Sequence, residues 1–168
     1  MSSDYRGAGR NTQNVTPGTL KRMPTPPRSK NDWVENNRPV IEKFRREGRR
    51  TSGRTNLLLL LTTKGARTGR ERVTPLNFSR DGDRYIVMAT KGGSPTHPDW
   101  YHNLVAHPTV TVEADGEEFT ANAKVSAGAE RKRLLGIHST AMPFFGAYER
   151  KVKKREIPVI ALERTPAR

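Results

Sequence analysis

At its most apolar point the chain reads Leu57-Leu-Leu-Leu-Leu-Thr-Thr-Lys-Gly-Ala-Arg-Thr-Gly69, a short apolar run followed by a basic loop. The run is far shorter than the roughly 20 residues that a membrane span needs. Its length and the glycines that follow it predict a buried strand over 57–63. A second strand, Arg72–Ser79, comes directly after the loop, so the two segments predict an antiparallel hairpin.

The rest of the chain repeats this pattern of short strands separated by turns. Asp81-Gly82 and Asp115-Gly116 are typical of tight hairpin turns, and Pro98 is suited to open a helix. We expect the remaining strands at 84–90, 109–113, 118–125 and 157–163, and helices at 98–106, 129–137 and 144–154. This order lacks the strand–helix alternation of a parallel sheet. The sequence therefore predicts a mainly β (α+β) fold, a barrel of about six antiparallel strands with flanking helices.

The N-terminal part of the chain has a different composition. Residues 1–30 are rich in Ser, Thr, Asn, Gly and Pro and bury too little apolar surface to fold, so we expect a disordered basic tail. Residues 31–53 are expected to form a helix, which Pro39 can kink, and a linker. Five apolar residues recur there at roughly helical spacing: Trp33, Val34, Val40, Ile41 and Phe44. The helix either packs on the main domain, residues 54–164, or rests on a membrane surface.

Charge and cysteine content restrict the partners. The 168 residues include 31 Lys and Arg against 17 Asp and Glu, a net charge of +14. Residues 1–50 hold twelve basic and five acidic side chains, so half of the excess lies in less than a third of the chain. This predicts an acidic partner, which can be nucleic acid, an anionic membrane surface or a small polyanion. The lack of cysteine excludes disulfides, thiolate metal sites and a cysteine nucleophile.

Two basic loops that contain glycine are the candidate binding elements. The first, 62–72, combines four cations with three threonine hydroxyls, and the second, 89–96, places two adjacent glycines beside Lys91. Backbone N–H groups and cations of this kind suit phosphate or carboxylate, while Trp100 and Tyr101 offer surfaces for a planar group. Both loops can equally be solvated hairpin turns. The four histidines lack metal-ligand spacing and no nucleophile triad is visible, so redox chemistry would belong to a bound cofactor.

Five separated blocks of sequence have the order and spacing of one known family. They lie between about Asn31 and Glu163 and read Leu57–Gly69, Arg72-Val-Thr-Pro-Leu76, Thr90-Lys-Gly-Gly93, His97-Pro-Asp-Trp-Tyr-His-Asn-Leu104 and Arg155-Glu-Ile-Pro-Val-Ile160. These blocks resemble the deazaflavin-dependent nitroreductase and quinone reductase family. The resemblance implies a split β-barrel reductase that uses coenzyme F420, an 8-hydroxy-5-deazaflavin with a phosphodiester and a glutamate tail. It also implies hydride transfer from reduced coenzyme F420 to a quinone or nitroaromatic acceptor.

The same resemblance implies which residues hold the cofactor. The anionic tail or phosphate would be held by Ala66, Arg67 and Thr68. The remaining cofactor contacts would come from Arg72, Val73, Thr74, Pro75, Leu76 and Asn77, from Met88, Ala89, Thr90 and Lys91, from Asp99, Trp100, Tyr101, His102 and Asn103, and from Phe145. No residue is expected to bind a metal.

The substrate side departs from some family members, which place several tyrosines around the pocket. The corresponding positions here are Asn77, Met142 and Phe145, and only Tyr148 keeps the phenol. The resemblance therefore makes Tyr148 the candidate catalytic residue. Because Phe and Met cannot donate a proton, reduction of an apolar quinone is at least as well supported as nitroimidazole activation.

Several alternatives stay open from the sequence. An FMN-binding split-barrel oxidoreductase, a basic nucleic-acid-binding protein and a non-catalytic cofactor carrier would each fit part of the pattern. The basic residues are spread through loops with few aromatics, which disfavours nucleic acid as a partner. We expect a cytoplasmic protein, with peripheral contact to the inner membrane face through the basic N-terminus as one option and a homodimer as another.

Overall fold

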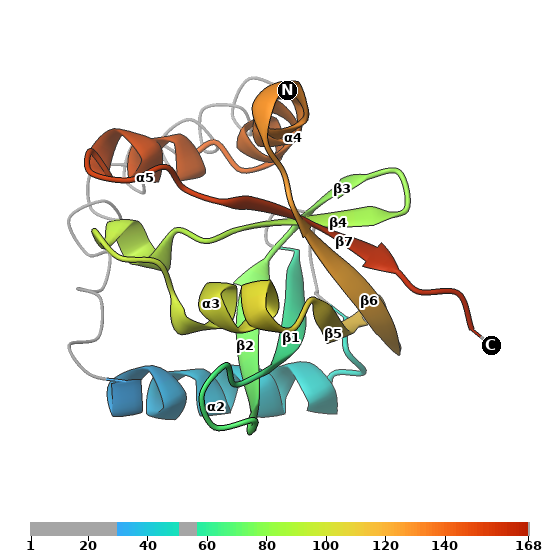
Figure 1. Cartoon of the computed structure of the whole chain (residues 1–168). Helices are drawn as coiled ribbons and strands as arrows, with labels where there is room; N and C mark the ends of the chain where they lie inside the picture. The colour runs from blue at the N-terminus through green and yellow to red at the C-terminus, as the bar shows by residue number, and fades with distance from the viewer. Residues whose placement is uncertain (1–29, 51–56, 168) are drawn as a thin grey trace, which may run out of the picture.

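The computed structural model of the chain describes residues 30–50 and 57–167, with side chains from Val34 onward. The predicted tail therefore lies outside the described residues, apart from Lys30. The strands are β1 (Leu58–Lys64), β2 (Glu71–Asn77), β3 (Ser79–Asp81), β4 (Arg84–Met88), β5 (Thr109–Ala114), β6 (Glu117–Val125) and β7 (Val159–Arg164). The helices are α2 (Lys30–Arg46), the 3-10 turn η1 (Lys91–Gly93), α3 (Asp99–Ala106), α4 (Gly128–Ala141) and α5 (Phe145–Lys151), arranged as in Figure 1.

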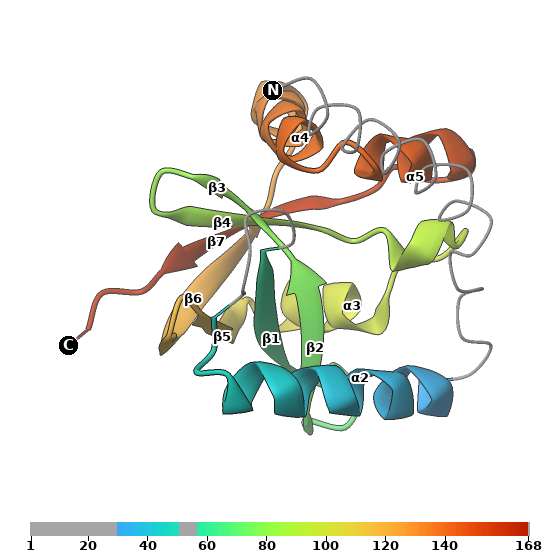
Figure 2. The same ribbon diagram turned by 180° about the vertical axis from the view of Figure 1, so that it is seen from behind.

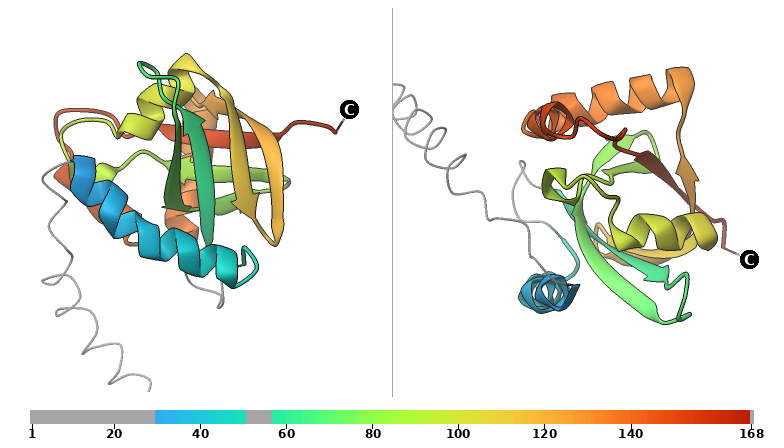
Figure 3. Two further views of the ribbon diagram at one scale, coloured as in Figure 1. Left: turned by 90° about the horizontal axis from the view of Figure 1, so that it is seen from below. Right: turned by 60° about the vertical axis from the view of Figure 1, so that its left-hand side comes forward.

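One seven-stranded antiparallel sheet, in the order β2-β1-β5-β6-β7-β4-β3, curls on itself (Figure 3). β2 ends at Asn77 and β3 begins at Ser79, although the two strands lie at opposite ends of the sheet. Only Phe78 separates them, and its backbone N–H donates to the Leu57 carbonyl at 3.0 Å. This continuity confirms the predicted split antiparallel barrel. There are seven strands rather than about six because residues 79–81 form a short strand of their own.

The turn between β5 and β6 shows why the hairpins were predictable. Asp115 and Gly116 have φ angles of 55° and 84°, and the flanking residues Ala114 and Glu117 pair directly. Positive φ at both central positions defines the type I′ turn, which Asp-Gly favours because glycine adopts it without strain. The helices also form where predicted, although α5 ends at Lys151, three residues earlier than expected.

Two apolar clusters lie on the two faces of β4 and β7. Tyr85 and Val87 of β4 belong to the cluster inside the barrel, whereas Ile86 and Met88 belong to the cluster beneath α4 and α5. Successive side chains of a strand point to opposite faces, so both faces of β4 are buried. Figure 2 shows α4 and α5 together at one end of the molecule, with α2 at the opposite end.

Helix α2 is one continuous helix that begins at Lys30, although Pro39 lies within it. Among its described side chains, which begin at Val34, Phe44 is buried and Asn37 and Ile41 are half-buried. Val34 and Val40 are 51% and 40% exposed, so the expectation of one continuous apolar face is wrong for these two residues. Helical spacing alone does not specify which of the apolar residues contact the rest of the fold.

A buried carboxylate on β5 anchors the end of α2. Glu113 is 2% exposed and accepts hydrogen bonds from Arg45 Nε at 3.0 Å and Arg49 Nε at 2.9 Å. The bonds from Arg45, supported by those from Arg49, lower the pKa of the Glu113 carboxyl against the opposing effect of burial. The Gly116 N–H also donates to the Arg49 carbonyl at 3.0 Å, so both backbone and side-chain hydrogen bonds join the segment after α2 to β5 and the turn that follows it.

We expect Glu113→Gln to lower the free energy of unfolding by about 1.5–3 kcal/mol at pH 7, the usual contribution of hydrogen bonds to a charged group. Because the folded-state pKa is lowered, this stabilisation is present above about pH 4 and is lost as the pH falls through the folded pKa. Urea unfolding at pH 7 and at lower pH measures both effects. Glu118→Gln, which alters an exposed carboxylate at 4.0 Å from Arg49, is the control. Equal stability of Glu113→Gln and the wild type at pH 7 would contradict an anchoring role.

Candidate functional site

The first basic loop, between β1 and β2, is closed by its own hydrogen bonds. The Gly65 N–H donates to the Arg70 carbonyl at 2.8 Å, and the Arg70 N–H donates to Thr68 Oγ1 at 3.3 Å. A Cβ at Gly65 would lie 2.8 Å from that hydroxyl and 3.1 Å from the carbonyl, so the turn requires glycine. The predicted anion-binding residues Ala66, Arg67 and Thr68 are exposed at its tip.

Asn103 of α3 attaches this loop to the helix. Its side-chain carbonyl accepts a hydrogen bond from the Ala66 N–H at 3.0 Å, and its amide donates to Thr63 Oγ1 at 3.2 Å. Asn103 and Thr63 are both buried. The predicted cofactor residue Asn103 is thus a support for the loop, because both of its polar atoms are engaged with protein.

The second basic loop has an unusual backbone. Lys91, Gly92 and Gly93 have consecutive positive φ angles of 47°, 61° and 81°. A non-glycine residue such as Lys91 rarely adopts this conformation, and loops that do so concentrate at binding sites. A Cβ at Gly93 would lie 2.8 Å from Lys151 Cδ, so α5 packs closely on this loop.

Arg155, which precedes β7, holds the second loop in place. Its Nη1 donates to the Ala89 carbonyl at 3.1 Å, its Nη2 to the Thr90 carbonyl at 2.9 Å and its Nε to the Ser94 carbonyl at 3.1 Å. Burial lowers the pKa of this guanidinium. Arg155 was not among the predicted site residues. The signal available was its position at the start of the last family-like block.

Helix α3 connects the two loops. It bonds the first loop through Asn103, and it follows the second loop along the chain after residues 97 and 98. Trp100 is buried in the barrel cluster, whereas Tyr101 is half-buried and His102 is exposed. The structure therefore brings the predicted residues of both loops and of α3 into one region.

The strand β2 is the half-buried element of the predicted site. Residues 73–77 are all half-buried, while Arg72 is exposed. The expected contacts from this strand, Val73, Thr74, Pro75, Leu76 and Asn77, therefore remain accessible in part.

Four of the predicted cofactor contacts are core residues. Ala89 and Trp100 belong to the cluster inside the barrel, while Met88 and Phe145 belong to the cluster beneath α4 and α5. All four side chains are buried, and the two pairs lie on opposite faces of the sheet. In this structure their contribution is packing beneath the loops, and they do not form one common surface.

Tyr148, the candidate catalytic residue, lies half-buried on α5. Its ring packs edge-on against Phe145 with centroids 5.6 Å apart, and burial raises the pKa of the phenol. Within residues 34–50 and 57–167, no side chain or backbone group bonds its hydroxyl. The phenol is therefore protonated near neutral pH and has a donor available.

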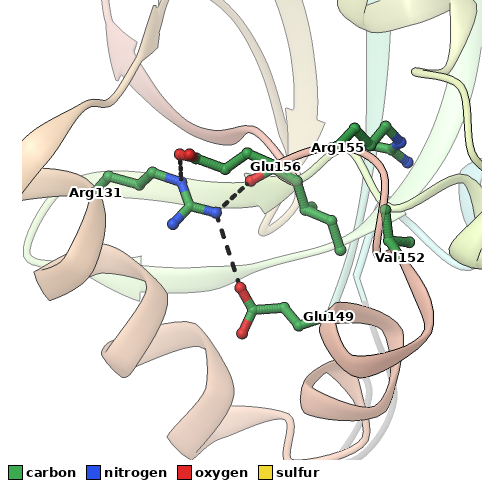
Figure 4. A pocket seen from close by; sticks show the side chains of 6 residues that line it. Arg131, Glu149, Val152, Arg155 and Glu156 are labelled. Carbon is green, nitrogen blue, oxygen red and sulfur yellow. Dashed lines mark hydrogen bonds and ion pairs between the residues drawn. The ribbon is translucent and has the colours of Figure 1, made fainter.

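A polar cleft of about 200 Å³ lies between α4, α5 and the segment 152–157 (Figure 4). Arg131 makes most of the polar contacts in this cleft. It forms ion pairs with Glu156 at 2.6 Å and Glu149 at 3.8 Å, and its Nη2 donates a hydrogen bond to the Ile157 carbonyl at 2.8 Å. The positive and negative charges that line the cleft compensate one another, so the cleft does not attract anions as the basic loops do. Arg155, which bonds the second loop, also lines the cleft. Across the described ranges, no three His, Asp or Glu residues are grouped to hold a metal ion.

Comparisons with known proteins agree with this arrangement. A family model described as F420H(2)-dependent quinone reductase matches residues 36–164. An F420H(2)-dependent quinone reductase of Mycobacterium tuberculosis H37Rv is 47% identical over 79 residues, which are 47% of this chain and 52% of that protein. The chain thus spans about half the length of such curated relatives.

Two solved structures share the fold at substantial identity. One, described as an F420-H2 dependent reductase (FDR-A), is 36% identical with a TM-score of 0.59, over 63% of this chain and 93% of that chain. The other, described as a domain-swapped dimer, is 34% identical with a TM-score of 0.62, over 80% of this chain and 100% of that chain.

Proposed function

The chain belongs to the F420H(2)-dependent quinone reductase family, and from this membership we propose that it transfers a hydride from reduced coenzyme F420 to a quinone. The observation that carries the proposal is a group of cations at the first loop, four in number against the one carboxylate of Glu71, which lies opposite Lys64 in the strand pairing. Lys64, Arg67, Arg70 and Arg72 are all exposed, and none forms a salt bridge within the described part of the chain. Elsewhere arginines such as Arg84 are paired with carboxylates.

These residues fit the cofactor by their chemistry. Four unpaired cations beside a glycine turn suit a phosphodiester and several glutamate carboxylates better than the single phosphate of FMN. The second loop adds Lys91 and a backbone that requires glycine at Gly93. We assign the tail to the first loop and the rest of the cofactor to β2 and the second loop.

When bound, reduced coenzyme F420 supplies the hydride. The chain supplies orientation, since Asn103 and Arg155 hold the two loops at fixed positions on α3 and before β7. Reduction of a quinone builds negative charge on its oxygen. We assign to the Tyr148 hydroxyl the donation of a hydrogen bond or proton to that oxygen.

We favour a quinone over a nitroaromatic acceptor because Met142 and Phe145, which replace phenols, are apolar and buried. Helix α2 exposes Val34, Val40 and Arg38, which supports a cytoplasmic protein that contacts the inner membrane face, where apolar quinones reside. None of the described helices is long and apolar enough to cross a membrane. A homodimer is part of the proposal, in line with the dimeric structural relative.

Arg67→Ala should weaken binding of coenzyme F420 by about tenfold to a hundredfold, because one charge-assisted hydrogen bond to the anionic tail is lost. The effect should shrink at high salt, since Arg67 is exposed. Fluorescence titration at two salt concentrations measures it. Lys132→Ala, which removes an exposed cation from α4, is the matched control. Unchanged affinity at low salt would remove the first loop from the site.

Steady-state turnover tests the activity itself. Purified full-length protein should oxidise reduced coenzyme F420 in the presence of menadione, and more slowly with a nitroimidazole. Absence of turnover with every quinone, despite tight cofactor binding, would contradict the reductase assignment and favour a cofactor carrier.

A further inference from the structure

We infer that Arg155 fixes His97 in a single neutral tautomer, whose Nε2–H is a hydrogen-bond donor to an oxygen of the bound cofactor. Arg155 is then a positioning residue and His97 a binding residue. Neither was among the predicted site residues. The part that concerns the cofactor rests on the proposed function, whereas the tautomer is a property of the protein alone.

The contact between the two residues is direct. Arg155 Nη1 lies 3.0 Å from His97 Nδ1, and the same guanidinium bonds three carbonyls of the loop that leads to His97. These four contacts leave the guanidinium little freedom to turn away. The loop from Ala89 to His97 is therefore wrapped around one cation.

The chemistry of the pair sets the position of the proton. A guanidinium has only donors, so His97 Nδ1 must accept, and the proton of the neutral ring must reside on Nε2. Protonation of Nδ1 would remove the acceptor and place two cations 3.0 Å apart. In support, burial and then the charges of Arg155 and His102 lower the pKa of His97.

The other ring nitrogen is on the side of the ring away from Arg155. No group of the described residues bonds Nε2, and His97 is only half-buried. The titratable and charged groups that face the ring are Arg155 before β7 and Tyr101 and His102 on α3, with ring centroids at 4.7 Å and 5.9 Å. On its own loop Lys91 bonds Thr96, the residue before His97.

This arrangement places a neutral donor in the second loop between the cation Lys91 and the aromatic residues of α3. Such a donor suits an acceptor oxygen of the cofactor, either in its anionic tail or on its ring system. A neutral N–H keeps the same hydrogen-bonding character throughout the physiological pH range, which a histidine at its ordinary pKa does not.

The tautomer can be measured without any cofactor. Long-range ¹H–¹⁵N NMR of histidine-labelled protein at pH 7 should show His97 protonated on Nε2 and unprotonated on Nδ1, with His97→Phe used for assignment. Arg155→Met should move the His97 pKa up towards its ordinary value of about 6.5, and a mixture of tautomers should appear. Lys154→Met, which removes the exposed neighbouring cation, should leave the tautomer unchanged.

A wild-type ring that is protonated on Nδ1, or doubly protonated at pH 7, would overturn the inference. This holds even if Arg155→Met does not fold, because the decisive spectrum is that of the wild type. It is also independent of the proposed function, since no deazaflavin is present.

Binding measurements then test the role of His97. His97→Phe should weaken coenzyme F420 binding by about tenfold, and His97→Gln, which retains a donor near the same position, should restore most of it. Repeating the titration with a deazaflavin that lacks the phosphodiester and glutamates locates the acceptor. A loss with both compounds assigns it to the ring system, and a loss only with the whole cofactor assigns it to the tail. Equal affinity of wild type and His97→Phe for both compounds would refute the binding role.

Discussion

Replacing Tyr148 by phenylalanine should lower turnover with menadione by about a hundredfold to a thousandfold and leave the affinity for coenzyme F420 unchanged. Loss of one donor that stabilises a developing oxyanion in a dry site costs about 2.7–4 kcal/mol. Tyr148 is half-buried beside Phe145, and its hydroxyl is available. The effect should appear in kcat, because the donor is needed where negative charge develops.

Tyr85→Phe is the matched control for this variant. The Tyr85 hydroxyl donates to Asp115, in the turn between β5 and β6, at 2.7 Å, so its loss should affect stability and not turnover. Wild-type kcat in Tyr148→Phe, with normal stability, would mean that the proton comes from solvent or backbone. Tyr148 would then only pack α5 against Phe145.

The second large effect that we expect is a loss of folding stability at low pH, caused by the buried His138. His138 of α4 is completely buried, its Nδ1 lies 2.7 Å from Ser79 Oγ, and its Nε2 has no hydrogen-bond partner among the described residues. Burial lowers the pKa of His138 to about 4. The folded state therefore keeps this ring neutral, edge-on to Phe145 at 4.6 Å.

The sign of the pH dependence follows from the two states. In the unfolded chain the ring has a pKa of about 6.5, so between pH 6.5 and 4 the unfolded state binds more protons than the folded state. Stability is highest above pH 6.5 and should fall by about 3 kcal/mol as the pH drops to 4, at 1.36 kcal/mol per unit. The stabilisation by Glu113 is lost at lower pH, so the two ranges can be separated.

Unfolding by urea at a series of pH values measures this loss. His138→Gln should flatten the curve between pH 6.5 and 4, whereas His107→Gln, which removes a half-exposed histidine, should keep its shape. A wild-type curve that is flat over this range would show that His138 is not buried as a neutral ring.

The strands and turns were predicted well from the sequence because they depend mainly on residues that are neighbours in the chain. The apolar run at 57–63 has the length of a strand, and Asp115-Gly116 requires a tight turn. The connection of the two edge strands, β2 and β3, through Phe78 was not predicted, since it depends on the order in which distant strands pair in the sheet. The opposite orientations of Met88 and Ala89 were predictable in principle, because neighbours in a strand point to opposite faces.

The long-range hydrogen bonds that hold the loops and helices in place could not be predicted from the sequence either. Arg155 bonds residues 58 to 66 positions away, and Arg45 reaches Glu113 across 68 positions. Nothing in a side chain's own neighbourhood specifies such a partner. The exposed cations of the first loop were identifiable from composition, but only the structure shows that they form no ion pair with the carboxylates of residues 34–50 and 57–167, while other arginines do.

The most direct test of a deazaflavin-dependent reductase is an equilibrium titration of the purified full-length chain with coenzyme F420 and, in parallel, with FMN. We expect saturable, salt-sensitive binding of coenzyme F420 in the micromolar range and no comparable binding of FMN. Tight binding of FMN without binding of coenzyme F420 would contradict a deazaflavin-dependent reductase.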